Sequence, residues 1–228
     1  MTTIATICAR GGSQGLPGKN IKLLHGRPLI AHTIAQALAC PAIQQVFVST
    51  DSDEIADAAR AAGADVPFLR PPELATASAA KLPVIKHLVE TIEATGVPIS
   101  RIVDLDPTSP LRTQVDITAC IALLDADTDC VITGYPAEKN PYFNMVERRA
   151  DGTVDLVKRL DMPVTSRQQA PEVFAMNASI YVWHRHSLDR GLWNGRTRIH
   201  PMPRERSIDI DTPIDFRLVE MLMAEAAR

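Results

Sequence analysis

Near the start of the sequence, a glycine-rich loop carries two cations in a pattern suited to binding phosphate. Residues 4–8 form an apolar run that predicts a buried strand, and the loop after it extends to residue 20. Glycine has no Cβ, so backbone N–H groups can turn toward an anion, and the cations add fixed positive charge. A glycine-rich surface turn is the alternative, since such turns are common. We expect a polyphosphate site formed by Ala9, Arg10, Gly11, Gly12, Ser13, Lys19 and Asn20.

The spacing of the glycines excludes two familiar phosphate-binding loops. A Walker A loop has four residues between its first glycine and Gly-Lys, followed by Ser or Thr. In this sequence five residues separate Gly12 from Gly18, and Asn20 follows the lysine. The dinucleotide fingerprint G-x-G-x-x-G is not matched in any frame of the loop. The loop therefore predicts a phosphate-binding site that is neither a Walker A loop nor a dinucleotide-binding loop.

Two carboxylates toward the other end of the sequence predict a metal site. Residues 207–211 alternate in a way typical of a strand, which would place Asp209 and Asp211 on one face and two isoleucines on the other. Their Cα atoms would lie roughly 6.6–7 Å apart, so both carboxylates could serve one hydrated Mg²⁺. Helix capping is the alternative for Asp211, because the proline at 213 is typical of the first turn of a helix.

Five stretches of the sequence resemble the cytidylyltransferases that activate sialic acid and related nine-carbon sugars. They occur in the family's order and span nearly the whole chain. Besides the glycine-rich loop, they are residues 48–51, residues 106–112, Arg167-Gln168 with Pro171 and Asn177, and residues 207–212. The resemblance implies transfer of CMP from CTP to a nonulosonic acid, with release of pyrophosphate and with Mg²⁺ as cofactor.

The resemblance also implies which residues carry the reaction. Arg10 and Lys19 would hold the triphosphate, and Asp209 and Asp211 the metal, so these four form the expected catalytic group. Negative charge grows on the phosphate oxygens during such a transfer, so positioning, cations and metal should matter more than a covalent nucleophile.

Two further side chains are candidates for contacts with the nucleotide. Asn20 has one acceptor group and two donors on a short amide, which suits it to a base edge or a ribose. Arg70 follows a predicted strand and precedes two prolines, so it is a plausible clamp on the nucleotide. An ordinary surface arginine is the alternative for Arg70.

On the sugar side, the sequence differs from the sialic acid enzymes that it resembles. Asp106 stands where they carry Gln, and a carboxylate can only accept hydrogen bonds or bind metal. Lys81 stands where they carry Ser. The stretches around these positions look more like the legionaminic acid branch, so we expect a legionaminic-type acid in preference to N-acetylneuraminic acid. The expected sugar-binding residues are Lys81, Asp106, Arg112, Arg167 and Gln168.

Arg167 and Gln168 would meet the sugar carboxylate and its neighbouring oxygens, because a guanidinium fork matches a carboxylate. An exposed ion pair is the alternative for Arg167.

Two other functions stay open. One is a cytidylyltransferase for an eight-carbon acid such as KDO, and the other is a nucleotide-binding regulator that has lost catalysis.

Apolar runs alternate with helical patterns along most of the chain. This predicts one α/β domain over residues 1–228, with a doubly wound, mostly parallel (mixed) sheet of nucleotidyltransferase type. Expected strands cover residues 3–8, 45–49, 66–69, 101–105, 129–133, 178–182 and 198–201. Expected helices cover residues 28–40, 52–62, 80–94, 114–125 and 213–227.

The alternation breaks over residues 136–176, which contain several prolines and only short β-like pieces at 142–147 and 154–158. The stretch is too long for a structureless loop in a compact domain, so it predicts a projecting arm. Its apolar residues favour an interface, and a two-fold dimer is the commonest closed assembly. In the resembled family this region exchanges onto a second subunit and completes its active site. The expected partner is therefore a second copy, with 136–176 as the dimerisation arm.

Composition limits the other partners. The 24 Lys+Arg and 27 Asp+Glu residues leave no polybasic face, so a nucleic-acid partner is not expected. No stretch reaches the ~20 apolar residues of a membrane helix, and the first residues do not resemble a secretory signal. Four scattered cysteines indicate free thiols in a reducing compartment, so we expect a cytoplasmic protein without a membrane partner.

Overall fold

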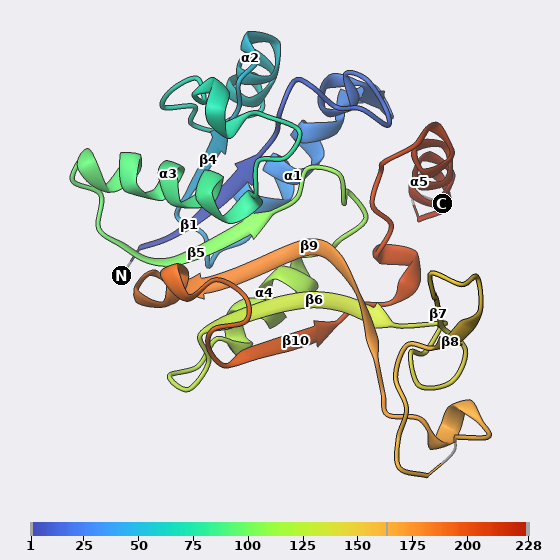
Figure 1. Ribbon diagram of the computed structural model, residues 1–228. Coiled ribbons are helices and arrows are strands. Elements are labelled where there is room, and N and C mark those ends of the chain that lie inside the picture. Colours follow the sequence, from blue (N-terminus) through green and yellow to red (C-terminus); the bar gives the residue numbers. More distant parts are fainter. Residues whose placement is uncertain (1, 163, 227–228) are drawn as a thin grey trace.

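A computed structural model of the protein describes residues 2–162 and 164–226. Its centre is a six-stranded sheet in the order β10-β6-β9-β5-β1-β4 (Figure 1). The strands are β1 (Thr2–Cys8), β4 (Gln45–Ser49), β5 (Ile99–Leu105), β6 (Cys130–Pro136), β9 (Phe174–His184) and β10 (Thr197–Pro201). Strand β9 is antiparallel to β5 and β6, and the other pairs are parallel. The predicted mixed, mostly parallel sheet is confirmed.

Helices cover both faces of this sheet, as in a doubly wound fold. The main helices are α1 (Leu29–Leu38), α2 (Asp53–Ala61), α3 (Lys81–Ala94), α4 (Gln114–Leu123) and α5 (Pro213–Ala226). Apolar side chains of α1, α2 and α4 share one buried cluster with the sheet, whereas those of α3 belong to a second cluster. Helix α5 contributes to a third, smaller cluster that includes Leu16 of the glycine-rich loop. Residue 227 of the last predicted helix lies outside the described residues.

Local capping explains where the helices begin. The Ser52 hydroxyl accepts a hydrogen bond from the Ile55 N–H and caps α2. Thr113 and Asp116 form a reciprocal capping box at the start of α4. None of the helices within residues 2–162 and 164–226 has the length and apolar character needed to cross a membrane.

The strand expected at residues 66–69 is wrong. Only two isolated bridges form there, between Phe47 and Asp65 and between Thr50 and Leu69. Pro67 lies between them and has no N–H to donate to a ladder, so the segment runs beside β4 without becoming a strand.

The remaining elements are short. Two further antiparallel pairs join β2 (Leu23–Leu24) to β3 (Arg27–Pro28) and β7 (Val146–Arg148) to β8 (Val154–Leu156). The 3₁₀ helices are η1 (Lys19–Ile21), η2 (Pro72–Leu74), η3 (Arg167–Gln169), η4 (Arg185–Arg190) and η5 (Arg204–Arg206).

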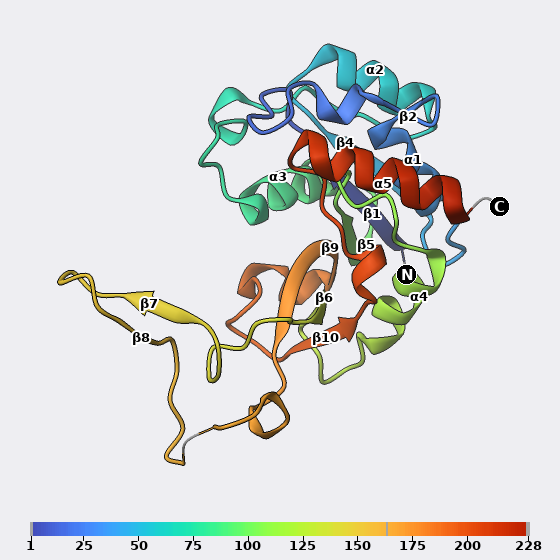
Figure 2. The same ribbon diagram turned by 90° about the vertical axis from the view of Figure 1, so that its right-hand side faces the viewer.

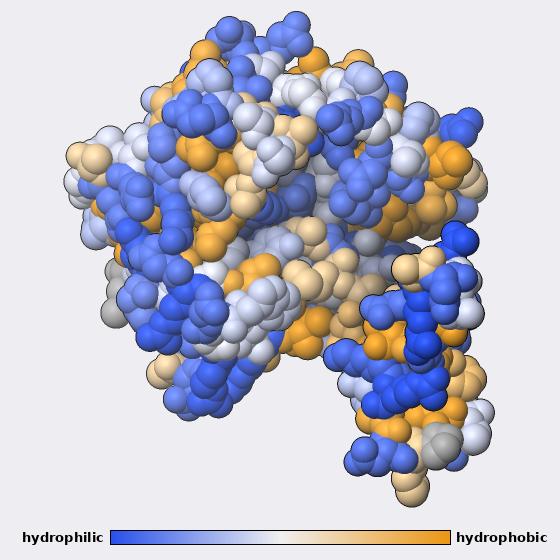
Figure 3. All heavy atoms as spheres, viewed as in Figure 1, coloured by the Kyte–Doolittle hydropathy of each residue, from blue (hydrophilic) through white to orange (hydrophobic). Residues whose placement is uncertain are grey.

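Between β6 and β9 the chain leaves the body as an arm, which Figure 2 shows in profile. The hairpin of β7 and β8 forms its far part, and Gly152 takes a positive φ of 87° in the hairpin turn. In Figure 3 the arm stands apart from the body, with apolar side chains among its polar ones. Its exposed large apolar residues are Met145, Val146, Val154, Leu160 and Met162. That this arm joins two subunits stays a prediction.

Candidate active site

The carboxyl ends of the neighbouring parallel strands β1, β4 and β5 meet at a pocket of about 550 Å³. Ligands of open α/β sheets bind in this position, outside the carboxyl ends of the strands. The pocket brings together predicted residues from five separate parts of the sequence. These are Arg10, Ser13, Lys19, Asn20, Arg70, Lys81, Asp106, Asp209 and Asp211. Other predicted residues do not line it, namely Ala9, Gly11, Gly12, Arg112, Arg167 and Gln168.

The glycine-rich loop differs in detail from the expected phosphate cradle. The Ala9 N–H donates to the Ser49 carbonyl at 3.0 Å, and the Gly11 N–H donates to Asp51 Oδ1 at 2.9 Å. These two N–H groups are therefore engaged within the protein rather than turned toward the pocket. At Gly15 a Cβ would overlap the Asp211 carbonyl oxygen, so the absence of a side chain lets the loop approach the segment that carries the two carboxylates.

The cations of the loop are held by partners that a nucleotide would have to replace. Lys19 Nζ lies 2.9 Å from Asp211 Oδ1 and 2.7 Å from the Ile210 carbonyl oxygen. Arg10 donates to the Thr76 carbonyl at 2.9 Å. One ion pair thus joins the residue expected to hold phosphate to a residue expected to hold metal, which places both at the same part of the pocket.

Asn20 and Arg70 are nearly buried in the pocket wall. The Asn20 amide donates to the Arg10 carbonyl, while its Oδ1 is buried without a hydrogen-bond partner among the described residues. The Arg70 guanidinium donates to the Ser49 hydroxyl and carbonyl and to the Ala9 carbonyl, and burial lowers its pKa. The surface-arginine alternative for Arg70 is therefore wrong, because this side chain fastens the loop to the end of β4.

Asp209 and Asp211 both line the pocket, although the strand expected over 207–211 does not form. The segment pairs with no strand, and one backbone hydrogen bond runs from the Ile210 N–H to the Thr108 carbonyl. The predicted alternation holds only in part. Ile210 is fully buried, but Ile208 is half-buried and lines a second pocket together with Asp209. Capping by Asp211 is wrong, because the Thr212 hydroxyl accepts the N–H three residues on and the Asp211 carboxylate pairs with Lys19.

The Asp209 carboxylate has the character of a cation ligand. Its Oδ1 is buried and has no hydrogen-bond partner within the described part of the chain. Burial, and next the charge of Asp106, raise the pKa of Asp209 to about 6. No cluster of three or more His, Cys, Asp or Glu side chains that could enclose a metal occurs within residues 2–162 and 164–226. Two carboxylates completed by phosphate oxygens and water suit Mg²⁺, which seldom requires an all-protein cage.

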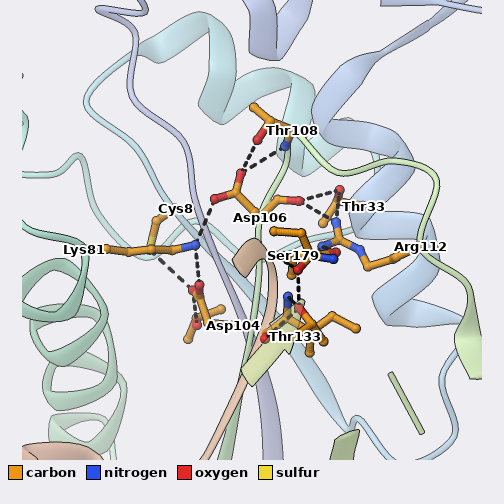
Figure 4. Close-up of polar contacts among 12 residues, drawn as sticks. Cys8, Thr33, Lys81, Asp104, Asp106, Thr108, Arg112, Thr133 and Ser179 are labelled. Carbon is orange, nitrogen blue, oxygen red and sulfur yellow. Dashed lines mark hydrogen bonds and ion pairs between the residues drawn. The ribbon is translucent and has the colours of Figure 1, made fainter. Parts of the chain in front are cut away.

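The floor of the pocket is a buried ionic cluster, drawn in Figure 4. Lys81 Nζ lies 2.8 Å from Asp104 Oδ2 and 2.9 Å from Asp106 Oδ2. The other oxygen of Asp106 accepts from the Thr108 hydroxyl at 2.6 Å and from its N–H at 3.1 Å. Burial alone would raise the pKa of Asp106, but Lys81 and Thr108 outweigh it and lower the pKa to about 2.

The sugar-binding role expected for Arg112 is wrong. Its side chain is 2% exposed and does not line the pocket. The guanidinium donates to Gln36 Oε1 at 2.9 Å, and its terminal nitrogens donate to the Thr33 hydroxyl and to the carbonyls of Asp106 and Ser179 (Figure 4). Arg112 therefore holds the turn after β5 in place from inside the fold and offers no donor to a ligand.

Arg167 and Gln168 lie on the arm, in η3, and line a different pocket near the root of the arm. Arg167 donates to the Ala137 carbonyl at 2.6 Å. Within one chain they do not reach the site between the strand ends. Their contact with the sugar stays a prediction that requires a second subunit.

Sequence reasoning missed Asp104, Thr108 and Cys8. Thr108 orients Asp106, and the half-buried Cys8 thiol lines the pocket at the end of β1. Asp104 had a readable signal, because it interrupts an apolar strand. A fully buried carboxylate at such a position needs a partner, and Lys81 is that partner.

Several known proteins resemble this chain over nearly its whole length. The family model described as cytidylyltransferase matches residues 4–227. The chain is 38% identical over 225 residues to the CMP-N,N'-diacetyllegionaminic acid synthase of Campylobacter jejuni, covering 97% of this chain and 94% of that protein. It is 37% identical over 226 residues to the post-translational flagellin modification protein B of Campylobacter coli, covering 97% and 95%.

Among solved structures, CMP:2-keto-3-deoxy-manno-octonic acid synthetase complexed with CTP is similar, with a TM-score of 0.72. At 19% identity, over 99% of this chain and all of that one, the likeness shows a shared fold. The chain belongs to the cytidylyltransferase family, and the expectation of a nucleotidyltransferase enzyme is confirmed.

Proposed function

We propose that this chain transfers CMP from CTP to a nonulosonic acid with release of pyrophosphate, and that it prefers a legionaminic-type acid to N-acetylneuraminic acid. The observation that carries the proposal is the pocket itself. Arg10, Lys19 and two carboxylates line it, Lys19 is paired with one of these carboxylates, and a lysine–carboxylate pair forms its floor. The name of the Campylobacter jejuni relative supports the same substrate class.

In this proposal the chain acts mainly by positioning. Arg10 and Lys19 would leave their protein partners and neutralise the triphosphate, so that negative charge developing on the phosphate oxygens is stabilised. Mg²⁺ held by Asp209 and Asp211 would supply further positive charge to the same oxygens. Asn20 and Arg70, both nearly buried, would fix the nucleoside end, because their side chains are already anchored to the loop.

The proposed preference for a legionaminic-type acid depends on Lys81 and Asp106 at the floor of the pocket. Asp106 can accept a hydrogen bond from a hydroxyl or an amide N–H of the sugar, and Lys81 can donate to a neighbouring oxygen. Four apolar residues also line the pocket, and they suit acyl methyl groups better than free hydroxyls. They are Leu74, Ala77, Ala79 and Val84.

We also propose a homodimer in which residues 136–176 lie against the partner and bring Arg167 and Gln168 to its sugar pocket. The exposed apolar residues of the arm support this arrangement, since apolar surface on a projecting segment usually marks an interface. We place the reaction in the cytoplasm, in keeping with four free cysteines.

Pyrophosphate release tests the proposed function. The assay combines CTP, GTP, ATP or UTP with a legionaminic-type acid, N-acetylneuraminic acid or KDO, with Mg²⁺ or with EDTA. We expect release with CTP and Mg²⁺, and the highest kcat/KM with the legionaminic-type acid. Preferred turnover of KDO would support the eight-carbon alternative. Nucleotide binding without release from any pair would support the regulator, and equal kcat/KM for the two nine-carbon acids would contradict the preference.

A further inference from the structure

Lys81 is held by two carboxylates, of which only one faces the pocket. Lys81 and Asp106 line the pocket, with side chains 32% and 21% exposed. Asp104 does not line it, and its side chain is fully buried. Any effect of Asp104 on a ligand must therefore pass through the lysine.

The sheet fixes the position of Asp104 from both sides. In register, Asp104 of β5 stands beside Thr6 of β1 and Tyr181 of β9. The Thr6 hydroxyl donates to Asp104 Oδ1 at 2.8 Å, and the Cys8 thiol lies 3.9 Å from the same oxygen. The Lys81 ammonium lies 5.0 Å from the centre of the Tyr181 ring.

A fully buried carboxylate near the carboxyl end of a central strand opposes folding unless its charge is compensated. Around it, Ile102, Val103 and Leu105 are fully buried and apolar. Stability alone does not explain such a pair, since replacing a whole buried ion pair by apolar residues of similar volume is often neutral or stabilising. The carboxylate therefore points to a role in the site rather than in the core.

We propose that Asp104 is a positioning residue, which holds Lys81 Nζ beside Asp106 so that the ammonium and the carboxylate present a fixed donor and a fixed acceptor to the sugar acid. The inference rests on the proposed function and deepens its sugar specificity. With both carboxylates present, one negative charge compensates the lysine and the other stays available as an acceptor. Without Asp104, Lys81 would pair with Asp106 alone, and both groups would lose their fixed orientation.

Titration of Lys81 gives a readout that a purely structural role of Asp104 would not require. The two neighbouring carboxylates raise the pKa of Lys81 well above its usual value, against the effect of burial. The other titratable groups facing it are the Cys8 thiol and the Tyr181 hydroxyl, from the strands on either side of β5.

The first experiment replaces Asp104 by Asn, which keeps the size and hydrogen-bonding atoms but removes the charge. NMR of isotope-labelled lysine side chains should show a lower pKa for Lys81 in Asp104→Asn. The KM for the sugar acid should rise about tenfold, the lower range for a lost charged hydrogen bond. The KM for CTP should stay within about twofold, because the nucleotide residues share no bond with Asp104. A lowered Lys81 pKa with an unchanged sugar KM would overturn the proposal.

Asp116→Asn is the matched control. Asp116 is also a buried carboxylate with a cation partner, Arg206 at 2.8 Å, but it lies at the start of α4 and outside the pocket. This variant should lower the unfolding temperature and leave both KM values unchanged. A comparable rise in sugar KM would mean that general destabilisation explains the Asp104 result, which would also overturn the proposal.

A double-mutant cycle tests whether Asp104 acts through Lys81. In a Lys81→Met background, the further change Asp104→Asn should not raise the sugar KM again and should restore stability, because it removes an unpaired buried carboxylate. An equal rise in KM in both backgrounds would overturn the proposal. If the protein releases pyrophosphate with no sugar acid, the proposed function fails. The titration of Lys81 still tests the role of Asp104 in that case, because an unchanged Lys81 pKa in Asp104→Asn would overturn the inference.

Discussion

The two sides of the pocket are organised in opposite ways. On the triphosphate side, Lys19 pairs with Asp211, whose side chain is 69% exposed, across 192 positions of sequence. On the floor, Lys81 is fixed between a fully buried carboxylate and a largely buried one. Under the proposed function, a ligand replaces the contacts of the first arrangement, whereas the second is in place before a ligand arrives. The triphosphate side should therefore determine the rate of the reaction, and the floor should determine which sugar reacts.

The largest expected effect follows from Asp211→Asn. The variant should fold normally, because this side chain is exposed, but kcat should fall about 100-fold or more, as for loss of one preorganised electrostatic contact in other enzymes. Steady-state kinetics over a range of Mg²⁺ concentrations measure this. If Asp209 serves the same ion, Asp209→Asn/Asp211→Asn should lose little more than either single variant. Wild-type turnover in Asp211→Asn at ordinary Mg²⁺ would refute the metal assignment.

A smaller and more selective effect is expected for Asp106→Ala. Losing one charged hydrogen bond costs roughly 1.5–3 kcal/mol, or about 10- to 150-fold in kcat/KM for the sugar acid. CTP binding should barely change, because the loop cations do not contact Asp106 in the described structure. A loss that extra Mg²⁺ recovers would instead place metal at Asp106 and remove the distinction between the two sides.

Substitution of the buried Arg112 tests whether this residue supports the fold or binds the sugar acid. Arg112→Lys keeps the charge but cannot supply the fork that binds Thr33, Gln36 and Ser179 together. We expect a loss of about 2 kcal/mol in the free energy of unfolding, within the range for charged hydrogen bonds. Denaturant titration measures that loss, and the KM for the sugar acid should change less than in Asp106→Ala. A sugar-specific defect at unchanged stability would return Arg112 to the binding site.

The sequence predicted what depends on short-range pattern. The strand that ends at Cys8 and the starts of α2 near Ser52 and of α3 near Lys81 each follow from neighbouring residues. It failed where the outcome depends on residues far apart in the chain. Arg112 belongs to a motif that resembles the family's and lies on a turn. Its side chain lies outside the pocket because it donates hydrogen bonds to Thr33 and Ser179, which are 79 and 67 positions away.

The carboxylates show the same contrast between what neighbouring residues predict and what distant residues determine. Alternation correctly predicted that Asp209 and Asp211 line the same pocket, but it was wrong for Ile208, which is half-buried and lines a second pocket with Asp209. It could not predict that no neighbouring strand would pair with the segment. Nor could it find the ion pair between Lys81 and Asp104, which joins the start of α3 to the last part of β5, 23 positions away.

The smallest expected effect is on the free energy of unfolding, which should depend on pH through the two carboxylates with shifted pKa values. Asp209, raised to about 6, binds its proton more readily folded than unfolded, so its charge opposes folding above that pH. The opposition fades as pH falls from about 6 to about 4, the ordinary carboxyl range. Asp106, lowered to about 2, acts in reverse: it stabilises the fold above about pH 4, and that contribution is lost as pH falls toward 2.

Asp209→Asn should therefore be more stable than the unmodified protein at pH 7, although inactive. A shift of about two pKa units corresponds to at most about 3 kcal/mol, and partial exposure reduces the expected gain to about 1 kcal/mol. Thermal unfolding between pH 4 and pH 8 measures this gain, which should vanish toward pH 4. Asp211→Asn is the control and should show no gain, because that carboxylate is already paired with Lys19. Lower stability of Asp209→Asn at pH 7 would mean that Asp209 supports the fold, and the triphosphate side would then be as fixed before binding as the floor.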